Sequence, residues 1–496
     1  QVPGFQLDDG DTNTRGFANA AGNLLINDRR PSAKQDLPSA ILLRIPSGNV
    51  ERIELIRGQV RDIDLRGQSA MINVITHEEN PASLRWGADV EVPVRHGPVT
   101  PSVYLSLSNT WNEIEYNAGL EIFKNSYGRD GMDQLFDGVG TLTENRIDNR
   151  ENRNVTYKGN LSTLTWLGET LFKFNGIYSF ETRDQELVSN RIPLAIGSPP
   201  RDVIFVDDVE SPEIEIGVDA ERNITPDLLG KAILLFFNSD TESLKTQEVI
   251  DDSGNQTSFR VADSTADSLE LITRLEFNWT RFEDHTVKAN MERAYNRLEG
   301  TLLQTLDTGT GPDIVDVPGA NSTVKEERYD FILQDIWSLA AYELDIGLGA
   351  EVSSITQTGD AEQTRDFFYL KPHAMLTYAP EQSEQTRFRV AREVAQLDLT
   401  EFVSATVFED DDLALGNPDL EPETTWVTEL SHERRFGQLS VLSLRLFHHW
   451  IADVQDLLPL TTNFEVPGNI GSGRRWGFEI ESTLPMDRVG LDGSRL

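Results

Sequence analysis

From about Leu84 onward, apolar and polar side chains alternate with a period of two in one segment after another. Three clear segments are Thr170–Glu181, Leu269–Thr280 and Tyr342–Ser353, each with one mostly apolar face and one strongly polar face. Successive side chains of a β-strand point to opposite faces, so this alternation predicts strands that lie between an apolar and a wet environment. Helix signals are scarce, and we expect a mostly β fold.

Strand length and aromatic placement favour a membrane barrel over a soluble β-sandwich, which also alternates. Many segments run 10 residues or more, whereas soluble strands average about 5–6. Aromatic residues lie near segment ends, as an interfacial girdle requires, and examples are Trp279, Phe282, Tyr295 and Trp450. In such a barrel Phe174 and Leu275 would face lipid, and Lys173 and Glu276 would face the lumen.

The connections between the segments alternate in length. Short ones include Leu167–Glu169, Arg281–His285, Ala340–Ala341 and Phe436–Gln438, and long polar ones include Gly128–Glu151, Arg183–Glu213, Leu244–Ser268, Gly300–Lys325 and Gln396–Glu423. Bacterial outer-membrane barrels have short periplasmic turns and long extracellular loops. The sequence therefore predicts a large antiparallel transmembrane β-barrel.

Residues 1 to about 80 follow a different pattern. Short apolar runs at Asn23–Asn27, Asn49–Arg57 and Met71–Thr76 are separated by turns that contain Gly and Pro. This pattern predicts a small mixed α/β domain over residues 1–80 and a barrel over residues 81–496, with the boundary near His77–Ser83.

Composition narrows the classes of function. The chain of 496 residues has a net charge of −38 and no cysteine. Nucleic acid is not an expected partner, because its phosphates would be repelled, and Cys-ligated metal sites are excluded. The pair His448–His449 and the acidic run Glu409–Asp412 suit a strand end and a solvated loop better than a metal site. No nucleophile motif is present, so we expect no enzyme, no cofactor and no metal.

Several motifs occur in order along the chain. Val50–Gly58 reads V-E-R-I-E-L-I-R-G, Met71–Thr76 reads M-I-N-V-I-T, and Gly416–Glu423 reads G-N-P-D-L-E-P-E. Together with Leu24–Pro31 upstream, these runs resemble the TonB-dependent outer-membrane receptors, in which a small N-terminal plug fills a barrel of about 22 strands. The first two runs resemble the second half of the plug, and the third resembles the segment before a barrel strand.

The resemblance implies active import of a scarce large solute across the outer membrane of a Gram-negative bacterium. The implied partners are outer-membrane lipid and a TonB-type energy-coupling protein of the inner membrane. A ferric siderophore is the default cargo, with cobalamin, haem or an oligosaccharide as alternatives. A passive porin or a barrel adhesin is the alternative function, which the plug-like residues disfavour, and a soluble secreted β-sandwich array is a third.

The chain departs from the family pattern in two places. Gln59 follows Arg57-Gly58 where the family has proline, and no paired glycines precede Ile72, so this plug loop is expected to make different substrate contacts. The family's signal peptide, TonB-contacting segment and last strands have no counterpart. We therefore expect a partial plug and an incomplete barrel, without a continuous ladder between Leu84–Val94 and Arg475–Thr483.

The resemblance also implies site residues. Family plugs are held to the barrel wall by arginines that face glutamates, and the matching residues here are Arg15, Arg57 and Glu429. Cargo recognition is expected on the extracellular side, at long loops and the plug apex. An anionic chelate would require arginines, and the candidate residues are Arg29, Arg30, Arg61 and Asp62.

Overall fold

The computed structural model describes residues 5–10, 22–31, 34–57, 70–77, 82–93, 97–195, 197–360, 362–407, 412–414, 416–436, 440–459 and 465–484. Three of the candidate residues, Arg15, Arg61 and Asp62, lie outside these ranges. For Arg57 the backbone is described but the side chain is not.

The N-terminal domain is a three-stranded sheet with one helix. Its elements are β1 (Leu24–Ile26), α1 (Pro38–Arg44), a short 3-10 helix (Ser47–Asn49), β2 (Val50–Arg57) and β3 (Ala70–Thr76). The central strand β3 pairs parallel with β1 and antiparallel with β2. Leu24, Ile72 and Val74 form its core, against which Ile41 and Leu42 of α1 pack. Among the described residues, no helix is long and apolar enough to cross a membrane.

In the described part of the chain, seventeen strands form one antiparallel sheet that curves into a barrel. They are β4 (Ser83–Glu91), β5 (Thr100–Trp111), β6 (Ile114–Phe136), β7 (Leu142–Leu167), β8 (Thr170–Pro193), β9 (Arg201–Thr225), β10 (Leu228–Asp251), β11 (Gln256–Trp279), β12 (His285–Asp307), β13 (Pro312–Val315), β14 (Ser322–Leu339), β15 (Tyr342–Gly359), β16 (Gln363–Glu381), β17 (Glu384–Val394), β20 (Thr424–Phe436), β21 (Ser440–Pro459) and β22 (Glu465–Thr483). A separate hairpin of β18 (Ala405–Val407) and β19 (Asp412–Ala414) lies in the connection between β17 and β20. The expected fold class is confirmed.

The strand order is that of a closed barrel, in which β22 stands next to β4. With the exception of the short strand β13, each barrel strand pairs antiparallel with the next barrel strand along the chain, from the β4–β5 pair to the β21–β22 pair. Among the described residues, no continuous register runs between Leu84–Val94 and Arg475–Thr483. The expected incomplete closure of the barrel is thus contradicted by the closed strand order, although a continuous ladder at these residues is not among the described pairings.

The two faces of the strands point as the alternation predicts. On β15, Ile346 and Leu348 are more than half exposed on the outer face, whereas Asp345 and Glu351 are buried on the inner face. On β11, Leu275 is exposed on the outer face. The neighbouring residue, Glu276, lines a cavity beside the N-terminal domain. The apolar band therefore faces away from the lumen.

Outer-face aromatic residues mark the two edges of this band. Trp279 and Phe282 lie at the short turn between β11 and β12, with ring centroids 5.2 Å apart. Tyr295 lies ten residues along β12 from its first residue. Trp450 is paired in register with Trp426, which lies ten residues from the end of β20. A barrel strand crosses the hydrocarbon layer in about 9–11 residues, so this spacing fits one membrane thickness.

Most strands continue well beyond this band. β10 has 24 residues, which at ~3.3 Å per residue extend about 79 Å. The expected long loops at Gly128–Glu151, Arg183–Glu213, Leu244–Ser268 and Gly300–Lys325 are therefore wrong for most of their length, because paired strands run through most of each one. Beyond the band the outward face becomes polar too, as at the exposed Asp240 and Glu242 of β10, so the sequence loses its alternation while the backbone pairing continues.

Candidate functional site

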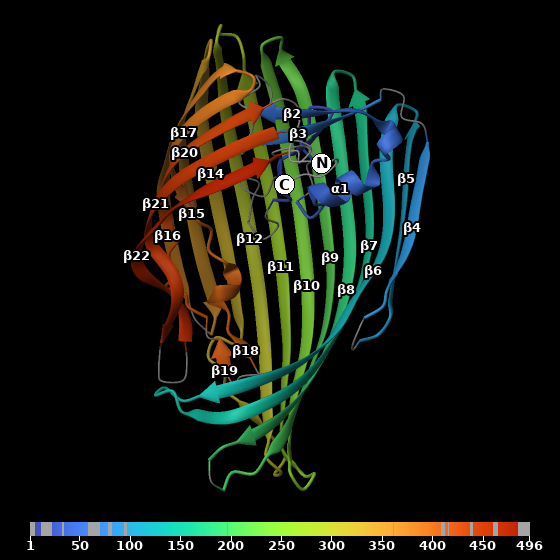
Figure 1. Ribbon diagram of the computed structural model, residues 1–496, viewed down its shortest axis with the longest axis vertical. Helices are drawn as coiled ribbons and strands as arrows, with labels where there is room; N and C mark the ends of the chain where they lie inside the picture. The colour runs from blue at the N-terminus through green and yellow to red at the C-terminus, as the bar shows by residue number, and fades with distance from the viewer. Residues whose placement is uncertain are drawn as a thin grey trace.

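The N-terminal domain lies inside the curve of the barrel (Figure 1). In that view α1, β2 and β3 lie in the upper half, and β18 and β19 lie toward the opposite end. Two cavities separate the domain from the wall. The wall residues that line them include several beside short turns, such as Thr110, Glu115 and Asp227. The domain therefore occupies the short-turn half of the lumen.

Lys34 and Gln35 join the N-terminal domain to the wall. Lys34 Nζ lies 2.7 Å from Glu270 Oε2 on β11, and both side chains are buried. The Glu215 carboxylate on β9 accepts hydrogen bonds from the backbone N–H groups of Lys34 and Gln35, each at 3.0 Å. We call these four residues the Lys34 site.

The local sequence explains the donors and acceptors of the Lys34 site. Lys34 and Gln35 lie between β1 and α1, so their N–H groups belong to no helix or sheet ladder and require other acceptors. Glu215 and Glu270 alternate with outward-facing neighbours and therefore point into the lumen. A carboxylate that accepts hydrogen bonds from two backbone N–H groups forms charge-assisted hydrogen bonds, which are about twice as strong as neutral ones.

Glu429, the predicted wall partner of Arg15 and Arg57, has three described cationic or imidazole neighbours. It forms an ion pair with Arg445 on β21, and its carboxylate lies 3.6 Å from Arg389 on β17 and 3.5 Å from His449. All three are wall residues. Because Arg15 and the side chain of Arg57 lie outside the described residues, the predicted contact with Glu429 stays a prediction.

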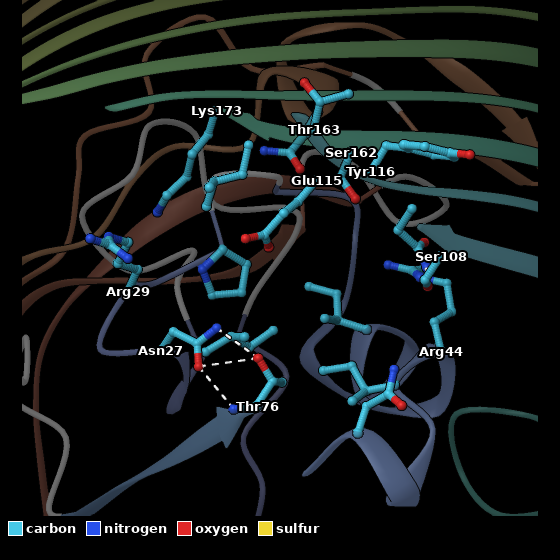
Figure 2. Close-up of a pocket in the computed structure, with 18 of the residues that line it drawn as sticks. Asn27, Arg29, Arg44, Thr76, Ser108, Glu115, Tyr116, Ser162, Thr163 and Lys173 are labelled. Carbon is cyan, nitrogen blue, oxygen red and sulfur yellow. Dashed lines mark hydrogen bonds between the residues drawn. The ribbon is translucent and has the colours of Figure 1, made fainter. Parts of the chain in front are cut away.

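Arg29 and Arg30 lie between two cavities that separate the N-terminal domain from the wall. The first has a volume of about 250 Å³ and is drawn in Figure 2. The second has a volume of about 640 Å³ and is lined by Glu221, Lys231 and Glu276, among others. Arg29 Nε lies 3.7 Å from Glu221, and Arg30 donates hydrogen bonds to the Gly22 carbonyl and to Met71 Sδ at 2.6 and 3.3 Å. Both arginines thus occupy the short-turn half of the lumen.

In the other half of the lumen, the connection between β17 and β20 packs against the inner wall. Leu399, Phe402 and Leu420 form a buried apolar cluster with Leu298, Val324 and Ile355 of β12, β14 and β15. Burial and the Asp398 carboxylate raise the pKa of Glu401 in the same connection. The connection is therefore part of the barrel interior rather than a solvated loop.

The G-N-P-D-L-E-P-E motif anchors this connection across the wall. Asn417 Nδ2 donates to the Pro467 carbonyl at 2.7 Å on β22, and Glu421 N donates to Asn469 Oδ1 at 2.9 Å. On the opposite side, Gln363 Nε2 of β16 donates to Asp419 Oδ1 at 2.8 Å. The motif thus spans from β16 to β22.

Replacing Asn417 with alanine is expected to weaken this anchor. The change removes the hydrogen bond to Pro467 and the one that Asn417 Oδ1 accepts from Asp419 N at 2.9 Å. At about 0.5–1.5 kcal/mol for each bond, the local loss is about 1–3 kcal/mol. Hydrogen exchange should accelerate at residues 416–423 and not at the β11–β12 ladder. Equal exchange in both proteins would show that the motif does not anchor the connection.

Sequence reasoning missed Lys34, Glu215 and Glu270. The alternation in β9 and β11 places both glutamates on the polar face, and this signal was available. However, each polar face carries several carboxylates, and the contact joins residues separated by 181 and 236 positions along the chain. Nothing local in a single sequence encodes that pairing.

Within the described ranges, no group of three or more His, Cys, Asp or Glu side chains is placed to hold a metal ion. His449 contacts Glu429 and receives a hydrogen bond from Arg475 at 3.1 Å. The neighbouring ring of His448 instead stacks on Trp450, with centroids 4.2 Å apart. The two rings point to different surroundings, as expected for neighbours on a strand.

Three comparisons place this geometry among known proteins. No curated protein sequence matches the chain. A variant of the ferric enterobactin receptor PfeA of Pseudomonas aeruginosa superposes with a TM-score of 0.58 at 15% identity, covering 100% of this chain and 75% of the receptor. The copper transporter OprC gives 0.54 at 13% identity, covering 97% and 72%. The siderophore receptor PiuA of Acinetobacter baumannii gives 0.54 at 13%, covering 97% and 73%.

At these identities the solved structures show a shared fold. The sequence itself matches the family model described as "TonB dependent receptor-like, beta-barrel" over residues 94–495. This match covers most of the chain, including every barrel strand from β5 to β22. The chain belongs to the family of TonB-dependent receptor-like β-barrel proteins.

Proposed function

We propose that the protein imports a scarce large solute across the outer membrane with energy supplied through a TonB-type protein of the inner membrane. The observation that carries the proposal is a separate N-terminal domain inside a membrane-type barrel, joined to the wall by a small number of contacts. An empty barrel of this size would leak. A domain that blocks the lumen must move before a large solute can pass, and that movement requires work.

Residues 1–80 act as the plug in this proposal, and residues 81–496 form the barrel. β3 ends at Thr76 and β4 begins at Ser83, on either side of the proposed boundary. The outer membrane stores no ATP or ion gradient, so the pull on the plug must come from another protein. Arg15, Arg57 and Glu429 are proposed as a further plug–wall contact beside the Lys34 site.

A ferric siderophore is the proposed cargo. Two of the structural relatives carry siderophore or ferric enterobactin receptor in their names, and a third is named a copper transporter. Cobalamin, haem and oligosaccharides are alternative cargoes. Arg29 and Arg30 lie in the short-turn half of the lumen, a position that suits a later step of passage better than first capture, and Arg61 and Asp62 are proposed for capture.

Uptake of radioactive iron tests the proposal. The protein is produced in a Gram-negative host that lacks its own siderophore receptors, with and without a functional TonB-type protein. We expect uptake of a ferric siderophore only when both proteins are present, because the plug blocks diffusion. Uptake of small sugars independent of the TonB-type protein would instead identify the alternative function, a passive porin. Retention of iron uptake without the coupling protein would contradict the proposal.

A further inference from the structure

We propose that the cavity of about 250 Å³ between the N-terminal domain and the wall binds a small amphipathic monoanion, a carboxylate with an apolar body. We call it the Lys173 cavity. It lies in the short-turn half of the lumen and is lined by residues of the N-terminal domain and of β5 to β8 (Figure 2). A concave, largely apolar site with a few converging polar groups is the usual form of a small-molecule site.

Apolar side chains from both sides line much of the cavity. They are Ile26, Pro31, Ile41, Ile45 and Pro46 of the N-terminal domain and Leu164 of the wall. Contact between such a lining and an apolar ligand removes both surfaces from water, which lowers the free energy of the complex. It accounts for the apolar part of the proposed ligand.

Two cationic side chains at the cavity make no hydrogen bond to a carboxylate among the described residues. Arg29 Nε is buried without a hydrogen-bond partner in the described part of the chain, and its ion pair with Glu221 is long, at 3.7 Å. No described carboxylate lies within salt-bridge distance of Lys173, since its register partner Asp219 lies 3.3 Å from Lys231 instead. A buried donor without an acceptor is costly, so an anion that accepts from these groups would be stabilised.

The two cations reach the cavity from different parts of the molecule. Figure 2 shows the Lys173 ammonium coming from the wall and the Arg29 guanidinium from the N-terminal domain, on the same side of the cavity. Lys173 interacts electrostatically with the cations Lys231 and Arg29 and with the carboxylates Asp219 and Glu221. A ligand carboxylate that accepts from Lys173 and Arg29 gains two charge-assisted hydrogen bonds, which neither group forms with a carboxylate of the described residues.

The remaining charges limit the ligand to a single negative charge. Glu115 also lines the cavity, and its carboxylate would oppose a second anionic group. Arg44 already forms an ion pair with Asp36. Arg29 and Lys173 thus define one anionic subsite within a cavity that apolar side chains also line.

A bound monoanion would contact the N-terminal domain and the wall at once. It would therefore add a second bridge between them, closer to the short turns than the Lys34 site. Occupancy of the Lys173 cavity would stabilise the docked position of the N-terminal domain, so such ligands would oppose its movement.

The test is a fluorine NMR titration of 4-fluorophenylacetate against the whole protein in lipid nanodiscs. We expect saturable line broadening. The Kd should rise at least about ten-fold in Lys173→Met and in Arg29→Gln, since each removes one charge-assisted hydrogen bond. The neutral 4-fluorophenylacetamide should bind at least about ten-fold more weakly for the same reason.

Arg222→Gln is the matched control, because Arg222 also lies at the short-turn end of the wall but is exposed, pairs with Glu169 at 2.7 Å and does not line the cavity. Its Kd should stay within about two-fold of the parent. Heat-modifiable gel migration shows whether each variant is folded. Equal binding of acid and amide, tighter binding of 4-fluorophenethylamine, or an unchanged Kd in folded Lys173→Met would each overturn the proposal. Absence of binding to the folded parent protein would do so too.

Discussion

Replacing Glu270 with alanine is expected to destabilise docking of the N-terminal domain by about 3–5 kcal/mol. The change leaves the Lys34 ammonium buried without its partner, because the side chains of Lys34 and Glu270 are 4% and 7% exposed. Hydrogen exchange of the β3 amides, which belong to the core of the domain, measures the loss. At about 1.4 kcal/mol for each factor of ten, protection should fall by roughly two to four orders of magnitude.

Glu151→Ala provides the matched control for this experiment. Glu151 forms an ion pair with Arg153 at 3.0 Å in an outer hairpin, and the two side chains are 40% and 54% exposed. Exposed pairs contribute about 0–1 kcal/mol, so exchange in β3 should hardly change. If Glu270→Ala leaves the protection of β3 at the parent level, the Lys34 site does not hold the domain.

Placing arginine at Phe174 or Leu275 is expected to cost about 2–4 kcal/mol of barrel stability, because a guanidinium would then lie near the middle of the hydrocarbon layer. Each residue is four positions from the short-turn end of its strand, Thr170 on β8 and Trp279 on β11. That position is close to the centre of a span of about ten residues. Denaturant titration in lipid vesicles, followed by tryptophan fluorescence, measures the loss.

Ser179→Arg on the same strand is the comparison for Phe174→Arg. Ser179 lies on the lumen face and donates a hydrogen bond to Glu213 at 3.1 Å, so an arginine there has water and a carboxylate beside it. Its effect should stay within about 1 kcal/mol. A larger loss for Ser179→Arg than for Phe174→Arg would mean that the two faces of β8 are assigned the wrong way round.

The alternation predicted those parts of the fold in which one face of each strand is apolar and the other face is polar. Phe174 and Leu275 lie on the apolar outer face while their neighbours face the lumen, and the sequence shows that difference directly. The outer hairpins escaped prediction because their outward faces carry exposed polar residues such as Asp240 and Glu242, so the two faces no longer differ in polarity. Backbone hydrogen bonds pair those strands, and such bonds do not depend on whether the side chains are polar or apolar.

The candidate site was predictable only in part. The polar faces of β9 and β11 predict that Glu215 and Glu270 point inward, but their contact with Lys34 depends on how the N-terminal domain is rotated inside the barrel. That rotation is set by many long-range contacts together. The family resemblance selected Glu429 instead, and among the described residues its close neighbours are Arg389, Arg445 and His449 of the wall.

In the outer membrane proposed above, the length of the outer hairpins would determine which part of the protein lies farthest from the lipid. A strand of 24 residues such as β10, less the ten or so in the bilayer and tilted by about 40°, stands roughly 35 Å clear of the lipid. Its tip at Ser253 and Gly254, an exposed turn, would be among the first parts to meet an antibody or a virus. Exposed loop tips tolerate insertions. A peptide epitope inserted there would be displayed far from the membrane without touching the lumen.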